Sequence, residues 1–188
     1  MAQTLKRKRF LHSLGVADTA VALGKLFGGD LAKLALAGLL HDAAKELDDA
    51  QLLAIGTGEG LITDPAERDC PDLLHGPVSA WMARREWGID DPIILEAIHF
   101  HTFGKPDMCK EACIVFMADL IEPGRTYKDA VILRQLCRED LRGAMIKAIE
   151  QTYVYLERKK RPVHGATPLC HRWLVDERSL AVEWKARH

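Results

Sequence analysis

Apolar residues recur every three to four positions along most of the chain, which is the spacing of one helix face. Glycine, proline and acidic residues interrupt this pattern and mark where helices begin or end. The expected helices span residues 5–27, 31–46, 49–56, 73–87, 93–101, 108–121, 129–160 (as one or two helices) and about 168 to the C-terminus.

Local signals support these boundaries. Asp30 is placed to cap the helix that follows it, and Asp91 followed by Pro92 is a typical helix start. No run of alternating β-branched residues is long enough to predict a strand. The sequence therefore predicts an all-α protein of about eight to ten helices. We expect one helical domain over residues 1–162 and a C-terminal helical extension over residues 163–188, packed on the same domain.

The composition is that of an ordinary globular protein, with 48% hydrophobic and 28% charged residues, so disorder is not expected. A formal net charge of −1 provides no overall field that would attract nucleic acid or an anionic membrane. Two basic clusters, at 6–9 and 158–161, are interpreted as solvated helix ends, with local attraction of phosphate or RNA as the alternative.

The expected compartment is the cytoplasm. Five cysteines form no CxxC pair and no even framework, which indicates reduced thiols. The basic N-terminus leads into no clean apolar segment of the kind found in signal peptides. No stretch approaches the roughly 18 apolar residues of a membrane span. We therefore expect no contact with a membrane.

The sharpest chemical signal is the adjacent pair His41 and Asp42, near the end of the apolar segment 31–46. Neighbouring helix positions point about 100° apart, so this pair can bind one ion only where other helices also converge. Lys45 lies four residues after His41 and shares its helix face, where its amine could hold a phosphate oxygen beside a metal. Alone, a His-Asp pair is more often a surface feature.

Four further metal-capable residues stand near expected helix ends or on apolar helices. Each histidine taken alone is more commonly structural, but a buried, unpaired Asp119 would cost several kcal/mol and needs a partner. A mixed set of imidazoles and carboxylates suits iron, manganese, zinc or cobalt better than magnesium. The complete candidate set is His12, His41, Asp42, His75, His101 and Asp119.

The choice between His99 and His101 follows from helix geometry. Residues two positions apart point about 200° apart, so both rings cannot face one ion on a regular helix. His101 lies nearer the break at Gly104 and is our candidate ligand, whereas His99 is expected beside the site or on the surface. Structural or exposed positions are expected for the remaining three histidines: His164, His171 and His188.

The order His…His-Asp…His…His…Asp resembles that of the HD-domain metal phosphohydrolases, in particular their YqeK-type branch. The resemblance extends over roughly residues 8–175. Its motifs are HSLGV at 12–16, LHDAAK at 40–45, LHGPV at 74–78, AIHFHT at 97–102, ADLIEPGR at 118–125 and RPVH at 161–164.

This resemblance implies an HD-domain helical bundle that hydrolyses diadenosine tetraphosphate symmetrically to two ADP, at a dinuclear centre usually described as iron. Carried over by motif, the ligands of one metal ion would be His12, His41, Asp42 and Asp119. Asp42 would bridge to the second ion, which His75 and His101 complete. Lys45 and Arg125 match positions that would contact phosphate. Manganese, cobalt and zinc are the alternative metals.

Two other functions stay open. One is another nucleotide phosphohydrolase, such as a nucleotidase with a single metal ion, and the other is a non-catalytic HD module that binds nucleotide or RNA through its basic clusters. In the leading hypothesis the partners are a dinucleoside polyphosphate substrate and its ADP product. Nucleic acid is not an expected partner, and a homodimer is left open.

Overall fold

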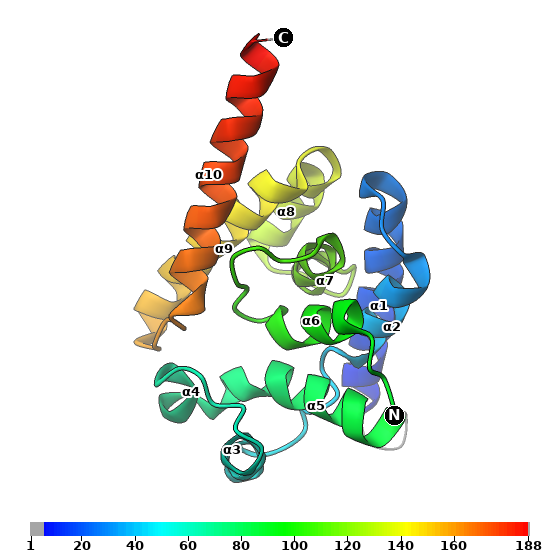
Figure 1. The fold of residues 1–188 in the computed structure, drawn as a ribbon, viewed down its shortest axis with the longest axis vertical. Coiled ribbons are helices and arrows are strands. Elements are labelled where there is room, and N and C mark those ends of the chain that lie inside the picture. The colour runs from blue at the N-terminus through cyan, green and yellow to red at the C-terminus, as the bar shows by residue number, and fades with distance from the viewer. Residues whose placement is uncertain (1–5, 188) are drawn as a thin grey trace.

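Ten α-helices and one 3-10 helix form the regular structure of residues 6–187, the part of the chain that this computed structural model describes, with side chains described for residues 6–176 (Figure 1). No strand occurs among these residues, so the prediction of an all-α fold is confirmed. In chain order the elements are α1 (Arg7–Phe27), α2 (Leu31–Leu40), α3 (Asp49–Gly58), α4 (Ala66–Asp69), η1 (Pro71–Leu74), α5 (His75–Trp87), α6 (Pro92–Phe100), α7 (Lys110–Ile121), α8 (Lys128–Glu139), α9 (Leu141–Lys159) and α10 (Ala166–Arg187).

The second helix ends earlier than its apolar pattern predicts. α2 stops at Leu40, and residues 41–47 form a series of tight turns. The N–H of Ala44 donates to the hydroxyl of Ser79 on α5 (2.9 Å) instead of to a helix carbonyl. The N–H of Ala43 bonds to the carbonyl of Leu40, three residues back, as in a 3-10 turn. A long-range hydrogen bond therefore ends the helix just before the His-Asp pair.

Capping acids set other boundaries as predicted. The carboxylates of Asp30 and Asp91 accept backbone N–H bonds at the starts of α2 and α6. The segment predicted as one or two long helices forms two, because the carboxylate of Asp140 caps α9 through the N–H of Gly143 (2.8 Å). These short-range signals act locally, so they could be seen in the sequence.

α7 is the central helix of the bundle. It packs against α1, α2, α6, α8 and α9, and 8 of its 12 residues are buried. A helix that is apolar on nearly all sides belongs in the interior of a domain. α7 therefore carries Asp119, near its C-terminal end, into the middle of the molecule.

Two glycines allow helices to approach closely beside the candidate site. A Cβ at Gly38 on α2 would lie 2.8 Å from the Cα of Ala17 on α1, and one at Gly76 on α5 would lie 2.6 Å from the carbonyl oxygen of His99 on α6. Any other residue would push these backbones apart. The glycines thus bring α1 against α2 and α5 against α6.

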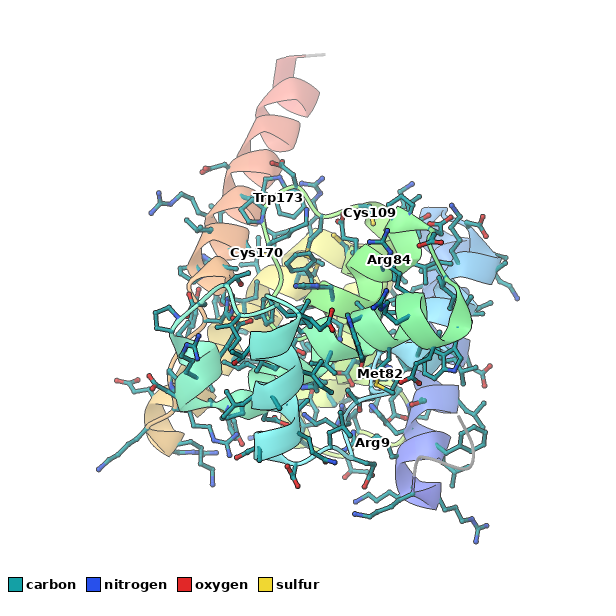
Figure 2. All side chains as sticks on the ribbon, turned by 60° about the horizontal axis from the view of Figure 1, so that its bottom comes forward. Arg9, Met82, Arg84, Cys109, Cys170 and Trp173 are labelled. Carbon is teal, nitrogen blue, oxygen red and sulfur yellow. The ribbon has the colours of Figure 1, made fainter. Side chains whose placement is uncertain are left out.

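The segment after α9 packs back onto the bundle. The His164 ring stacks on that of Phe103, with centroids 3.8 Å apart, and Thr167 donates to the carbonyl of Phe103 (3.0 Å). Figure 2 shows Cys170 and Trp173 on the side of α10 nearest the bundle, while Figure 1 shows the end of α10 projecting beyond the other helices. The division of the chain at residue 162 stays a prediction.

α1 differs from the prediction made from the sequence about membrane-spanning segments. It is long and apolar enough to cross a membrane by length and composition, contrary to the prediction that no stretch comes near this. However, it packs against α2 and α7 and its Val16 and Ala20 are fully buried among core residues. A core helix of a bundle passes the same length-and-composition test, and α1 is placed as one.

Candidate metal centre

Four imidazole rings from separate helices meet in the interior. His12 lies on α1, His41 directly follows α2, His75 begins α5 and His101 directly follows α6. Ring centroids are 5.2 Å apart from His12 to His41, 4.8 Å from His41 to His101 and 4.9 Å from His101 to His75. The helices therefore gather four side chains that are far apart in the sequence.

The orientation of each ring is set by a hydrogen bond from its Nδ1. In His41, His75 and His101, Nδ1–H donates to the backbone carbonyl three residues earlier, at 2.7 Å for His41 and for His101. In His12 it donates to Oε1 of Glu122 at 3.0 Å. A neutral imidazole carries one proton, so a ring of this kind in its neutral form has that proton on Nδ1 and a lone pair on Nε2. The four Nε2 atoms face the common centre.

Asp42 stands between two groups of histidines. Its Oδ2 lies 3.5 Å from Nε2 of His41 and 3.7 Å from that of His12. Its Oδ1 lies 3.3 Å from Nε2 of His75 and 3.8 Å from that of His101. Burial opposes ionisation, but the neighbouring imidazoles hold the pKa of Asp42 well below its usual range. This arrangement suits a carboxylate that bridges two cations.

Asp119 supplies the second carboxylate. Its Oδ1 lies 3.0 Å from Nε2 of His12 and 3.7 Å from that of His41. Arg125 binds it twice, through Nη2 to the carboxylate and through Nε to the Asp119 carbonyl (2.7 Å). Burial opposes ionisation, but His12, His41 and Arg125 lower the pKa of Asp119 below its usual value. Two negative charges therefore face four nitrogen donors.

The unprotonated nitrogens need a cation between them. Nε2 of His75 and of His101 face each other at 3.0 Å, and Nε2 of His41 is buried without a hydrogen-bond partner. Burial, with repulsion from its neighbours His41 and His75, lowers the pKa of His101 to about 3, and burial lowers that of His41. Lone pairs so placed repel one another unless a positive charge lies between them.

The spacing of the donor atoms also fits metal ions. Ligand atoms held about 2.1 Å from one ion lie about 3 to 3.4 Å apart, close to many distances in the cluster. Three overlapping groups have ligand atoms that all lie within 4.8 Å of one another. They are His12–His41–Asp42, His41–His101–Asp119 and Asp42–His75–His101. All six residues singled out in the sequence are thus brought together, and as a donor set they fit a metal centre.

Glu122 is a site residue that the sequence reasoning missed. Its buried carboxylate accepts the Nδ1–H of His12 and the N–H of Gly124. A Cβ at Gly15 would come within 2.8 Å of the same carboxylate, so only glycine leaves it room there. Carboxylates placed behind histidine ligands fix the ring and its tautomer. The motifs around 12–16 and 118–125 contain both partners, but no local spacing links them.

Arg9 is a second missed residue. Its guanidinium donates to Oδ2 of Asp42, and Figure 2 shows it beside α1 in the lower part of that view, on the side of α1 towards the other helices. It lies three residues before His12 on α1, so the two share one helix face. That spacing was available in the sequence as a signal.

Lys45 lies at the edge of the cluster. Its amine donates to Oδ1 of Asp72 (2.7 Å) and lies 3.2 Å from Nδ1 of His75. Lys45 therefore lies on the Nδ1 side of the His75 ring, whereas Nε2 of that ring faces Asp42.

A cavity of about 1080 Å³ opens beside the donor cluster. Its wall includes His12, Glu122 and Arg125 on one side and the basic residues 6–9 on another. These basic residues were interpreted from the sequence as a solvated helix end. In the structure they also line the cavity, which favours the alternative interpretation, local attraction of phosphate.

The other histidines lie outside the cluster. The His99 ring packs near Phe103, at 6.2 Å between centroids, and burial lowers its pKa to about 4. His164 is buried against Phe103, and His171 is partly exposed near Glu150. His188 lies outside the described residues.

Comparison with known proteins places the chain in a family. The HD domain matches residues 9–124. A symmetrical bis(5'-nucleosyl)-tetraphosphatase of Bacillus subtilis is 36% identical over 92% of each chain, and one of Staphylococcus aureus is 36% identical over 89% of this chain and 87% of the relative. A crystal structure from Clostridium acetobutylicum, described as an HD superfamily hydrolase involved in NAD metabolism, is 37% identical with a TM-score of 0.90 over 93% of each chain.

The resemblance inferred from the motifs is thereby confirmed. Similarity to these relatives extends well beyond the matched domain and includes α8, α9 and part of α10, since it covers more than nine-tenths of the chain in two of them. The chain belongs to the HD-domain family.

Proposed function

We propose that this protein hydrolyses diadenosine tetraphosphate, and related dinucleoside tetraphosphates, symmetrically to two nucleoside diphosphates. The observation that carries the proposal is the convergence of four Nε2 atoms and two carboxylates beside a cavity with a basic wall. The names of the relatives from Bacillus and Staphylococcus support the choice of substrate.

The proposed ligands divide into two groups that share Asp42. One ion would be held by His12, His41, Asp42 and Asp119, and the other by Asp42, His75 and His101. The division is supported by the two oxygens of Asp42, each of which faces a different group of rings. When bound, two such ions would supply Lewis-acid charge neutralisation and would make a coordinated water more acidic.

Iron is the proposed metal, with manganese, cobalt and zinc as alternatives. Four imidazole nitrogens and two carboxylates form a mixed donor set, which suits these metals better than magnesium or calcium. The Nδ1 hydrogen bonds keep the rings in the tautomer that can bind.

Cationic side chains are proposed to hold and orient the phosphate chain. Arg125 reaches the cavity from one side while anchored on Asp119, and its planar guanidinium suits bidentate contact with phosphate. Lys45 would reach the phosphates by leaving Asp72, whose side chain is half exposed. Once the phosphate chain is positioned for in-line attack, its hydrolysis needs little further chemistry from the protein.

The test is product analysis with metal-loaded protein. Anaerobically purified protein loaded with iron or manganese should convert diadenosine tetraphosphate to ADP alone. Formation of AMP and ATP would contradict symmetrical cleavage. Asp42→Ala should lose bound metal and turnover together, whereas a non-catalytic nucleotide-binding module would keep its nucleotide affinity in this variant.

Metal content separates the proposal from a single-metal nucleotidase. Two ions per chain are expected, with His75 and His101 both required for turnover. One ion per chain, with both histidines dispensable, would support the nucleotidase instead. We also propose a cytoplasmic location, and the homodimer stays a prediction that size-exclusion chromatography can test.

A further inference from the structure

A second cavity, of about 660 Å³, lies between the start of α8 and the C-terminal half of α9. This volume is within the range of about 300–1,000 Å³ that is usual for small-molecule sites. It is separate from the donor cluster, since none of the six candidate ligands lines it. The proposed function, as described above, assigns no role to this second cavity.

The two cavities share two wall residues, Arg125 and Tyr127. Arg125 is the residue that binds Asp119 of the donor cluster and lies 3.3 Å from Nε2 of His12. Tyr127 is held by a 2.7 Å hydrogen bond from its hydroxyl to the carbonyl of Leu120. The wall of the first cavity also includes residues of α1, and the wall of the second includes residues of α9.

The wall of the second cavity has the chemistry of a nucleoside site. Gln151, Tyr155 and Arg158 recur at helical spacing along one face of α9. Tyr155 is 46% exposed, so its ring is open to contact. An aromatic ring can stack on a base, an amide can both donate to and accept from a base edge, and a guanidinium can bind phosphate.

Symmetrical cleavage requires two binding regions of this kind. The bond that breaks lies at the midpoint of the substrate, so a nucleoside with two phosphates extends from the donor cluster in each direction. The first cavity, with basic residues 6–9 in its wall, offers room for one half. The second cavity, which has Arg125 and Tyr127 in common with the first, offers room for the other.

We infer that the cavity between α8 and α9 binds one nucleoside of the dinucleotide, with its base against Tyr155 and its phosphates towards Arg125 and Arg158. This inference rests on the proposed function and adds to it a site for the second half of the substrate. A second copy of the chain is the competing occupant, because Tyr155 and Val154 (66% exposed) are both open at the surface. The nucleoside is favoured because Arg125, which binds Asp119 of the donor cluster, lies in the walls of both cavities.

The test compares two ligands that share one phosphate chain. Isothermal titration calorimetry of metal-loaded protein would use a methylene-bridged analogue of diadenosine tetraphosphate and, separately, inorganic tetraphosphate, which has no base. Tyr155→Ala should weaken the dinucleotide analogue about tenfold, a typical loss for one base stack, and change the Kd of tetraphosphate less than about twofold. Tyr155→Phe, which keeps the ring, should restore the affinity.

Val131→Ala is the matched control, since Val131 is an exposed residue of α8 that does not line the cavity. It should leave both affinities unchanged. Equal losses for the two ligands in Tyr155→Ala, or no loss for either, would overturn the inference. An altered oligomeric state with unchanged affinities would assign the surface to a second copy and also overturn it.

Different experimental results would refute the proposed function and the proposed nucleoside site. Wild-type protein that releases no ADP from diadenosine tetraphosphate would refute the function. Wild-type protein that does release ADP, with a dinucleotide affinity unaffected by Tyr155→Ala, would refute the nucleoside site alone.

Discussion

Replacement of Gly76 by alanine is expected to weaken one of the two proposed ion sites and spare the other. A Cβ at this position would lie 2.6 Å from the carbonyl oxygen of His99, while ordinary van der Waals contact begins at 3.4 Å. The obstacle is backbone, so no side chain can rotate away. The start of α5 and the end of α6 must separate by about 0.8 Å, the difference between these two distances.

That separation is large for a metal site. His75 begins α5 and His101 directly follows α6, and their Nε2 atoms are 3.0 Å apart. Ion–ligand distances hold within about 0.2 Å, so these two rings can no longer reach one ion without distortion. We expect the affinity for the ion held by His75 and His101 to fall about 10- to 100-fold, as for loss of a supporting contact. The group of His12, His41 and Asp119 should keep its ion.

The same change has a smaller effect on stability. Overpacking costs about 1–3 kcal/mol, and alanine regains about 0.5–1 kcal/mol relative to glycine within a helix. The net loss of about 0–2.5 kcal/mol would lower Tm by at most several degrees in a chain of this size. Gly58→Ala is the control, because nothing lies within 4 Å of a Cβ there. It should leave both metal content and Tm nearly unchanged.

The measurement is metal content per chain after dialysis against graded concentrations of free metal. Wild type and Gly58→Ala should titrate with two ions, and Gly76→Ala with one tight ion and one weakened ion. If Gly76→Ala held both ions with wild-type affinity, then the close approach of α5 and α6 does not position the ligands and the reasoning is wrong.

Two further predictions concern residues around the cluster, and a third concerns Glu67 on α4, outside it. Glu122→Gln should weaken the ion held by His12 about 10- to 100-fold in a metal titration, because the charged acceptor that fixes the ring is lost; unchanged affinity would remove Glu122 from the site. Arg9→Ala should raise KM for diadenosine tetraphosphate about tenfold by removing a cationic hydrogen-bond donor, with two ions still bound in metal analysis; an unchanged KM would mean that Arg9 does not contact substrate. Burial opposes ionisation of Glu67, but the nearby His164 ring (3.5 Å) and the N–H groups of Thr63 and Asp64 lower its pKa. Its stabilisation is therefore present above the ordinary glutamate value of about 4.3 and is lost as pH falls through the lowered value. Glu67→Gln should flatten the acid side of a urea-unfolding profile, and an equally steep profile would count against this account.

The helices were predictable where a local signal marks their ends. Asp30 and the Asp91-Pro92 pair act on the N–H groups that follow them, so the sequence alone shows where α2 and α6 begin. The early end of α2 depends on Ser79, which lies 35 residues from Ala44 in the chain. Such a contact exists only after α5 has packed, and no local pattern records it.

The donor residues of the candidate site could be predicted from the sequence, but the residues that hold these donors in place could not. The His-Asp pair and the acid on an apolar helix have unusual local surroundings, which made His41, Asp42 and Asp119 recognisable. Glu122 acts on His12 across 110 residues, so its role appears only in three dimensions. Arg9 was closer to recognition, since its position one turn before His12 could have been read from helix periodicity.

The Nδ1 hydrogen bonds of the histidines have a consequence for experiments on this protein. Gly38 and Ile98, whose carbonyls accept from His41 and His101, lie in the last turns of α2 and α6, where carbonyl groups lack partners within the helix. Each of these two rings is thus a C-terminal cap as well as a proposed ion ligand. Substituting alanine for either would unravel a helix end as well as delete a donor, so the stability of such variants must be compared in metal-free protein before any loss is attributed to the ion.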